Sequence, residues 1–327
     1  MSDALVILAD IGGTNTRVAL ARGTAVDPAS IRRFANAEAS GLEPILRRFL
    51  ADAGLGSVQG ACIAAAGPVR DGVASMTNLD WVIDDAQLRR ATGASSVAIL
   101  NDLQAQGHAL GHIAAKDLRL LLDGPEKPGG SMLVVGLGTG MNAAPVHLAP
   151  WGRIVAASEC GHVSMPVQTA EDFALAEFLA HDIPGSHGFA GVEEAIAGRG
   201  LGHIHDFVSM RAGARSGIEA AEVMAALARG EARAREAARL YIHIMGQNLG
   251  NLALTHLPFG GIFLIGGVAR AMAPYLDELG FARAFRDKGR FAEFMDNFRV
   301  TLIEDDYAAL SGCAHYLASL SARGPGG

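Results

Sequence analysis

The chain has 327 residues, of which 50% are hydrophobic and 41 are glycine, and its formal charge is −7. This length is sufficient for two domains with a sizeable core, and the composition suits an α/β enzyme with many tight turns. Because the chain is acidic and has no run of Lys or Arg, nucleic acid is not an expected partner. The three cysteines, Cys62, Cys160 and Cys313, lie far apart without metal-binding spacing, and their odd number argues against a disulfide framework.

No signal peptide precedes the first apolar run, which starts by Ala4. The apolar stretch at 260–269 is too short to cross a bilayer and is bordered by glycines. We therefore expect a soluble cytoplasmic protein that does not interact with a membrane.

The segment 5–20 predicts a β-hairpin with a turn of the size of a phosphate group. An apolar run ends at Asp10, and a second run follows a turn of small and polar residues: Gly12, Gly13, Thr14 and Asn15. The glycines can adopt positive φ and have no Cβ, so their N–H groups can approach an anion, and the polar side chains add donors. Asp10 is placed to hold Mg²⁺ through water, since this ion prefers few carboxylates plus phosphate oxygens. The alternative is an ordinary hairpin with a glycine-rich turn.

The segment 132–146 repeats this design, with Gly136, Gly138, Thr139 and Gly140 in or beside its turn. Two such hairpins indicate a duplicated fold with a nucleotide held between the halves. Neither turn has the Lys-Ser/Thr ending of a P-loop or the helix pattern of a Rossmann motif, so a dinucleotide-binding fold is disfavoured.

The rest of the chain alternates predicted helices and strands. Helices are expected at 45–53, from 84 to 90, from Asn101 onward, and at 220–230, 231–254 and 306–321. Strands are expected at 60–66, 97–100, 154–157 and 261–267. The turn-rich stretch 121–130 lies near the expected domain boundary. We expect a small domain at 1–110, completed by a C-terminal helix at about 304–321, and a large domain at 111–303, with a disordered tail after the last helix.

Asn101 and Asp102 stand at the end of a predicted strand and open a helix. Asn and Asp are frequent N-caps, so capping alone would account for the pair. In open α/β sheets, however, ligands bind beyond the carboxyl ends of the strands, and an Asp placed there could accept a proton from a hydroxyl nucleophile.

Two further polar residues flank a flexible turn after an apolar strand. Glu159 and His162 could both hydrogen-bond a polyol, and the alternative for His162 is a bond to a local backbone carbonyl. Glu193, taken by itself, is interpreted as a solvated helix residue. His203 and His205 are interpreted as non-ligands, because residues two positions apart do not share a helix face.

Several ordered segments, which together cover nearly the whole chain, resemble the bacterial glucokinase family. These proteins are hexose kinases of the actin-like ATPase superfamily that lack the zinc-binding cysteines of the repressor-and-kinase clade. The matching segments are 10–17 and 136–140 (phosphate motifs), 65–69 and 76–81 (Ala-Gly-Pro and Thr-Asn-x-x-Trp), 100–103 and 158–163 (sugar loops), 260–268 (adenosine segment) and 287–291. The resemblance implies a two-domain actin-like ATPase fold, related to ribonuclease H, with duplicated mixed sheets flanked by helices and an interdomain cleft.

The resemblance also implies a role for each matching residue. Asp102 would be the general base for the 6-hydroxyl group of the sugar, and the other hydroxyl groups would be bound by Asn101, Glu159, His162 and Glu193. ATP would be bound by Gly12, Gly13, Thr14, Asn15, Gly138, Thr139, Gly266 and Gly267, with Asp10 serving Mg²⁺. Such residues suit phosphoryl transfer, which needs positioning, charge neutralisation and a carboxylate that accepts the hydroxyl proton.

The implied function is the ATP-dependent phosphorylation of glucose to glucose 6-phosphate, with ADP as the second product, by a homodimer associated through the larger domain. The alternatives are a kinase for another hexose, such as mannose, fructose or an amino sugar, and a catalytically weak sugar-sensing protein. A DNA-binding repressor is disfavoured, because no helix-turn-helix segment precedes the kinase core.

The chain departs from the family pattern within two of the matching loops. Asn142 stands where the second phosphate motif has glycine, and Pro145 is expected to interrupt the second strand of that hairpin. Ser158 and Cys160 replace glycines around Glu159 and would narrow the sugar loop. Asn is the non-glycine residue that most readily accepts positive φ, so we expect the loop to keep its shape and the kinase to be active. These departures bear on sugar identity and catalytic efficiency more than on the class of reaction.

Overall fold

The computed structural model describes residues 4–76, 79–150, 152–213 and 215–322. The chain divides into two compact units, one formed by Met1–Ala115, Ala149–Ala157 and Asp305–Gly327, the other by Lys116–Leu148 and Ser158–Glu304. The expected large domain, 111–303, includes the segment around β13 (Gly152–Val155), whereas in the structure this segment belongs to the first unit. It does so because Arg153 donates to the carbonyl oxygens of Gly107 and His108, at 2.9 and 2.8 Å.

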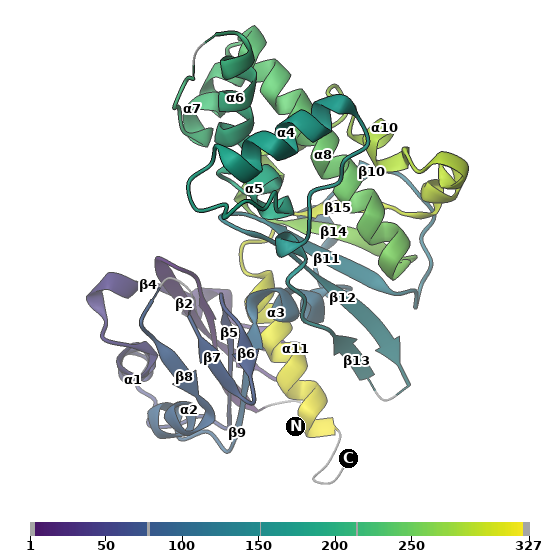
Figure 1. Ribbon diagram of the computed structural model, residues 1–327. Helices are drawn as coiled ribbons and strands as arrows, with labels where there is room; N and C mark the ends of the chain where they lie inside the picture. Colours follow the sequence, from purple (N-terminus) through teal and green to yellow (C-terminus); the bar gives the residue numbers. More distant parts are fainter. Residues whose placement is uncertain (1–3, 77–78, 151, 214, 323–327) are drawn as a thin grey trace. The chain divides into compact units, whose positions relative to one another are not determined.

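The sheet of the first unit begins with the expected N-terminal hairpin (Figure 1). Its strands are β1 (Leu5–Ile11), β2 (Asn15–Arg22), β3 (Ala25–Val26), β4 (Arg32–Ala35), β5 (Gly60–Ala65) and β9 (Ser96–Asn101). The order is β3-β2-β1-β5-β9, with β4 beside β2; β1 and β2 are antiparallel, and β5 and β9 run parallel to β1. Ile11, Ala65 and Asn101 lie in register, so the carboxyl ends of three strands meet beside the hairpin turn.

Successive apolar residues of β1 lie on opposite faces of this sheet, and both faces are buried. Ile7 and Ala9 join a core with residues of α1 and α2, while Val6 and Leu8 join a core with residues of α3 and α11. The bounds of these helices are α1 (Leu42–Asp52), α2 (Asp85–Thr92), α3 (Asp102–Ala109) and α11 (Ala308–Ala322). A small sheet of the same unit consists of β6 (Val69–Arg70), β7 (Val73–Ser75) and β8 (Val82–Asp84).

The second unit repeats the central strand pattern of the first, as expected for a duplicated fold. Its strands are β10 (Leu118–Leu122), β11 (Met132–Leu137), β12 (Met141–Ala149), β14 (Gly261–Ile265) and β15 (Val300–Ile303). β11 and β12 form an antiparallel hairpin, and β14 and β15 follow in parallel to β11, just as β5 and β9 follow β1. β10 adds an antiparallel strand beside β15.

Most of the second unit is helical. Its α-helices are α4 (Ala170–His181), α5 (Val192–Ile196), α6 (Gly200–Arg211), α7 (Ala220–Ala228), α8 (Ala232–His256), α9 (Gly267–Met272) and α10 (Phe281–Arg286). The long helix α8 packs against α6 and α10, and its Tyr241, Ile244 and Leu249 are fully buried. The short 3-10 helices of the two units are η1 (Pro28–Ser30), η2 (Asn36–Glu38), η3 (Ala115–Asp117), η4 (Cys160–His162), η5 (Ala273–Tyr275), η6 (Gly289–Phe291) and η7 (Glu293–Asn297).

The predicted helices and strands are present within a few residues of their expected ends, but two details are wrong. β14 is shorter than expected, because Gly266 and Gly267 begin α9 instead of extending the strand. Pro145 does not interrupt β12: it lies opposite Leu133 within a continuous strand, since a proline removes only one N–H group from the ladder.

Parts of two expectations fall outside the described residues, namely Thr77 and Asn78 of the Thr-Asn-x-x-Trp match and the tail after Ala322. The strand expected at 154–157 is β13, which ends at Val155. Among the helices that the structure describes, none combines the length and the apolar character that crossing a bilayer requires.

Candidate active site

Asn101 and Asp102 occupy the junction between β9 and α3. Asn101 is the N-cap: its Oδ1 accepts the N–H of Leu103 at 3.0 Å, and its Nδ2 donates to the carbonyl oxygen of Gly67 at 3.1 Å. Gln104 completes a capping box, because its Oε1 accepts the N–H of Asn101 at 3.1 Å. The capping interpretation is confirmed, and it places Asp102 at the strand end where ligands bind in open α/β sheets.

The carboxyl group of Asp102 has a pKa above that of an ordinary aspartate. Burial raises its pKa to about 6, although the N–H of Leu103, 2.8 Å from Oδ1, acts in the opposite direction. The negative charge of Asp10 contributes to the rise. A carboxyl group with this pKa is mostly ionised at neutral pH and is a better proton acceptor than an ordinary aspartate.

Asp10, near the carboxyl end of β1, is paired with Arg17 across the hairpin. Arg17 Nη1 lies 3.0 Å from Asp10 Oδ2, and the two residues face each other in the ladder of β1 and β2. Burial raises the pKa of Asp10, and the guanidinium of Arg17 opposes this rise. The ion pair therefore favours the ionised carboxylate, which is the form that could hold a divalent cation.

The turn between β1 and β2 is braced by Asn36, a buried residue of η2 that the sequence analysis did not single out. Asn36 Nδ2 donates to the carbonyl oxygen of Gly12 at 2.8 Å, and its backbone N–H donates to that of Thr14 at 2.9 Å. Its Oδ1 accepts from Thr16 Oγ1 at 2.8 Å. A Cβ at Gly12 would meet only the carbonyl oxygen of Asn15, at 3.5 Å, and φ is not positive there, so packing within the chain does not require glycine.

The second glycine-rich turn joins β11 to β12. Gly138 N donates to the carbonyl oxygen of Gly140 at 2.9 Å, and the carbonyl oxygen of Gly138 accepts the N–H of Gly198 at 2.7 Å. A Cβ at Gly138 would meet no atom within 4 Å. At Gly266, where φ is +103°, a Cβ would lie 2.2 Å from the carbonyl oxygen of Leu137. The fold itself therefore requires Gly266, whereas the space at Gly138 is open.

Glu193, on α5, is not the solvated helix residue that its local sequence suggests. Its side chain is only 16% exposed, and Oε2 accepts the N–H of Met141 at 2.9 Å. Oε1 lies 2.8 Å from Arg199 Nη2, and Arg199 Nη1 reaches the carbonyl oxygen of Thr139 at 3.4 Å. Sequence reasoning missed Arg199, because an arginine between two glycines has no periodicity that distinguishes it from a solvated loop residue.

Glu159 and His162 belong to the loop that contains η4, and both side chains are exposed. This loop packs closely on β12, since a Cβ at Gly161 would lie 2.0 Å from the carbonyl oxygen of Met141. The same Cβ would be 3.4 Å from Glu193 Oε2. The structure therefore brings the sugar loop, Glu193 and the second glycine-rich turn together within the second unit, while Asp10 and Asp102 share one sheet edge in the first unit.

His203 and His205, which the sequence analysis interprets as non-ligands, each have a partner within the second unit. His203 Nδ1 lies 3.0 Å from the carbonyl oxygen of Glu194, and His205 Nδ1 lies 2.7 Å from Ser216 Oγ, so both histidines have structural partners. Within the described ranges, no group of three or more His, Cys, Asp or Glu side chains could hold a metal ion.

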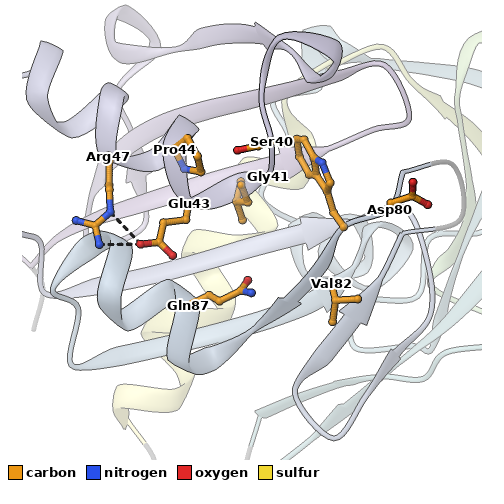
Figure 2. A pocket seen from close by; sticks show the side chains of 10 residues that line it. Ser40, Gly41, Glu43, Pro44, Arg47, Asp80, Val82 and Gln87 are labelled. Atoms are coloured by element: carbon orange, nitrogen blue, oxygen red, sulfur yellow. Dashed lines mark hydrogen bonds and ion pairs between the residues drawn. The ribbon is translucent and has the colours of Figure 1, made fainter.

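The first unit also has a surface pocket of about 520 Å³ between α1 and the segment around Trp81. Figure 2 shows Glu43 and Arg47 at its wall, where they form an ion pair of 2.7 Å. None of the predicted catalytic, sugar-binding or nucleotide-binding residues lines this pocket, so it is not part of the candidate active site.

The model of the glucokinase family matches residues 7–320. The chain belongs to the glucokinase family. It is 31% identical to the glucokinase of Chromobacterium violaceum over 316 residues, which cover 95% of this chain and 89% of that protein. It is 30% identical to the glucokinase of Mesorhizobium japonicum over 321 residues, which cover 98% of this chain and 93% of that protein. This glucokinase-family enzyme is a hexose kinase that phosphorylates glucose with ATP as the phosphoryl donor.

Solved structures agree with this assignment. The chain is similar to the crystal structure of a glucokinase from an Antarctic psychrotroph, with a TM-score of 0.85 and 27% identity over 96% of this chain and 98% of that one. The glucokinase of Balamuthia mandrillaris, solved in complex with glucose, gives a TM-score of 0.77 at 22% identity, over 96% of this chain and 93% of that one. The duplicated mixed sheets are therefore those of the two-domain actin-like kinase fold that the resemblance implied.

Proposed function

We propose that the enzyme transfers the γ-phosphoryl group of ATP to the 6-hydroxyl group of glucose, with Asp102 as the general base. The observation that carries this proposal is the place of Asp102 at the end of β9, where burial raises its pKa to about 6. Oδ1 accepts the N–H of Leu103 at 2.8 Å, which orients the carboxylate and leaves Oδ2 for the hydroxyl proton. The hydroxyl oxygen attacks the γ-phosphorus, its proton passes to Asp102, and ADP leaves.

The two glycine-rich turns are the proposed phosphate sites. A Cβ at Gly138 would meet no atom within 4 Å, and a Cβ at Gly12 would meet only the carbonyl oxygen of Asn15, at 3.5 Å. Glycine at these positions would let phosphate oxygens approach the backbone of the turns closely. A Cβ at Gly267 would likewise meet no atom within 4 Å, which leaves room for the nucleotide at the start of α9. The remaining residues that we assign to ATP are Gly13, Thr14, Asn15, Thr139 and Gly266.

The oxygen donors of Asp10 fit Mg²⁺, which binds few carboxylates and keeps water and phosphate oxygens as its other ligands. Asp10 Oδ2 is already paired with Arg17, so we assign Asp10 to the ion through water rather than directly. When bound, Mg²⁺ would neutralise charge on the phosphates. The homodimer, the cytoplasmic location and the nucleotide held between the halves stay predictions.

Glucose offers hydroxyl groups, which carboxylates, amides and imidazoles can bind. We assign these contacts to Asn101, Glu159, His162 and Glu193. Glu193 remains available although both of its oxygens have partners, because each carboxylate oxygen can accept more than one hydrogen bond.

The test is to incubate the enzyme with ATP, Mg²⁺ and a panel of glucose, mannose, fructose and glucosamine, and to measure ADP release. We expect the highest kcat/KM for glucose, with glucose 6-phosphate identified as the product by phosphorus NMR. A higher kcat/KM for another hexose would overturn the assignment of glucose. Sugar binding without ADP release from any hexose would support the sugar-sensing alternative instead.

A further inference from the structure

Three side chains that stand in place of family glycines contact one another. Asn142 lies in β12, whereas Ser158 and Cys160 flank Glu159 in the sugar loop. Ser158 Oγ lies 3.1 Å from Asn142 Oδ1, and the N–H of Cys160 donates to the same oxygen at 3.2 Å. These departures from the family pattern therefore form one connected group, which we call the Asn142 cluster (Asn142, Ser158 and Cys160).

Asn142 does not have the left-handed backbone that its replacement of a glycine suggests. It is paired with Gly136 in the regular ladder of β11 and β12. In the described part of the chain, the non-glycine residues with positive φ are Asp71, His187 and Leu257. The side chain at this position is therefore explained by the hydrogen bonds that it makes and not by a special backbone conformation.

The amide group of Asn142 connects the strand to the sugar loop on both sides of Glu159. Its Nδ2 donates to the carbonyl oxygen of Ser158 and, at 3.2 Å, to Glu159 Oε2. Its Oδ1 accepts from the loop at Cys160, as described above. Ser158 Oγ also lies 2.6 Å from the carbonyl oxygen of Ala143, which attaches the loop to β12 a second time.

We propose that Asn142 is a positioning residue for sugar binding, because it fixes the loop around Glu159 and one oxygen of the Glu159 carboxylate. The inference rests on the proposed function, in which Glu159 binds glucose, and Glu159 Oε1 is the oxygen left for a sugar hydroxyl group. Glu159 is exposed, so without this bond its side chain would be free to adopt other rotamers. Replacing three glycines with bonded side chains also lowers the conformational freedom of the loop.

The main test compares glucose affinity, measured by calorimetry, in Asn142→Gly and Asn142→Asp. We expect Asn142→Gly to weaken glucose binding about 10-fold, since the charge-assisted hydrogen bond to Glu159 and the three bonds to the carbonyl oxygen and Oγ of Ser158 and to the N–H of Cys160 are lost. The KM for ATP should change less than about 3-fold. Asn142→Asp keeps the shape but brings a second carboxylate to Glu159, so glucose binding should weaken further and recover as the pH is lowered. Asn297→Gly is the matched control, because Asn297 Nδ2 donates to a local group, the carbonyl oxygen of Phe294, at 2.9 Å.

The triple variant Asn142→Gly/Ser158→Gly/Cys160→Gly, which restores the glycine pattern of the family, tests whether the cluster acts as a unit. Asn142→Gly alone removes the partner of two side-chain groups, Ser158 Oγ and Cys160 Sγ, which lie 3.1 and 3.5 Å from Asn142 Oδ1. The triple variant removes these two groups as well, while the backbone groups of positions 158 and 160 lose Asn142 in both variants. We therefore expect the triple variant to bind glucose more tightly than Asn142→Gly. Independent, additive effects would contradict a connected cluster.

Glu159→Gln separates failure of this inference from failure of the proposed function. If Glu159→Gln weakens glucose binding but both Asn142 variants stay within about 2-fold of the wild type, the positioning role of Asn142 is wrong and the assignment of Glu159 stands. If Glu159→Gln binds glucose normally, the inference loses its basis, while turnover by the wild-type enzyme continues to support the proposed reaction.

Discussion

Arg199 Nη2 lies 2.8 Å from Glu193 Oε1, and Nη1 of the same guanidinium lies 3.4 Å from the carbonyl oxygen of Thr139. A single side chain therefore connects a proposed sugar ligand with a proposed phosphate turn inside the second unit. The other oxygen of Glu193 accepts the N–H of Met141 at 2.9 Å. Glu193, Arg199 and Thr139 thus belong to one hydrogen-bonded group, and a change in Arg199 should affect both the proposed sugar ligand and the proposed phosphate turn.

We expect Arg199→Gln to raise the KM values for glucose and ATP together and to lower kcat/KM about 10-fold, because a hydrogen bond between charged groups typically contributes about 1.5–3 kcal/mol. Arg211→Gln is the control: Arg211 pairs with Glu171 at 2.9 Å, but Glu171 keeps a second partner, Arg239, at 2.8 Å. Steady-state kinetics with each substrate varied in turn measures both effects. Unchanged KM values in Arg199→Gln would show that this connection has no part in substrate binding.

Asp102→Asn should separate catalysis from folding. We expect kcat to fall about 10²- to 10⁴-fold, while glucose affinity, measured by calorimetry, changes little. The folded protein raises the pKa of Asp102, so the stability contributed by its protonated form is present at low pH and is lost as the pH rises through about 6. The variant should therefore be no less stable than the wild type at pH 7 in urea unfolding. Near-native turnover would contradict the role of general base.

The pH dependence of kcat/KM for glucose should report the same group. Asp102 must be ionised to accept the hydroxyl proton, and its pKa is about 6. We expect kcat/KM to be constant above this pH and to fall about tenfold for each unit below it. A profile that stays level down to pH 4 would mean that a different group accepts the proton.

Gly312→Ala should destabilise the first unit. A Cβ at Gly312, on α11, would lie 1.7 Å from the backbone carbonyl oxygen of Ala105 on α3, so one helix must move. Overpacking of this kind typically costs about 1–3 kcal/mol, which exceeds the gain in helix propensity of about 1 kcal/mol from alanine. Gly41→Ala is the control, because a Cβ there meets nothing within 4 Å and the backbone is extended, with φ of 161°. Equal urea midpoints for the two variants would contradict this packing account.

The local sequence was sufficient to predict both hairpins and the N-cap at Asn101, because the residues that decide these features lie within a few positions of one another. The apolar runs and glycine-rich turns predicted the hairpins, and their repetition predicted the duplicated strand order. For Asp102, the sequence predicted a position at a strand end, but its raised pKa depends on burial by the folded chain.

Tertiary structure decided the contacts that orient the candidate site. The bond between Asn36 and Gly12 spans 24 positions, that between Met141 and Glu193 spans 52, and that between Arg199 and Thr139 spans 60. No periodicity or turn chemistry encodes such pairs. From the local sequence, Glu193 is therefore interpreted as a solvated residue, and Asn142 as a residue tolerated in place of glycine because asparagine accepts positive φ. Their roles follow from the packing of the sugar loop on β12, which brings side chains from distant segments within hydrogen-bonding distance.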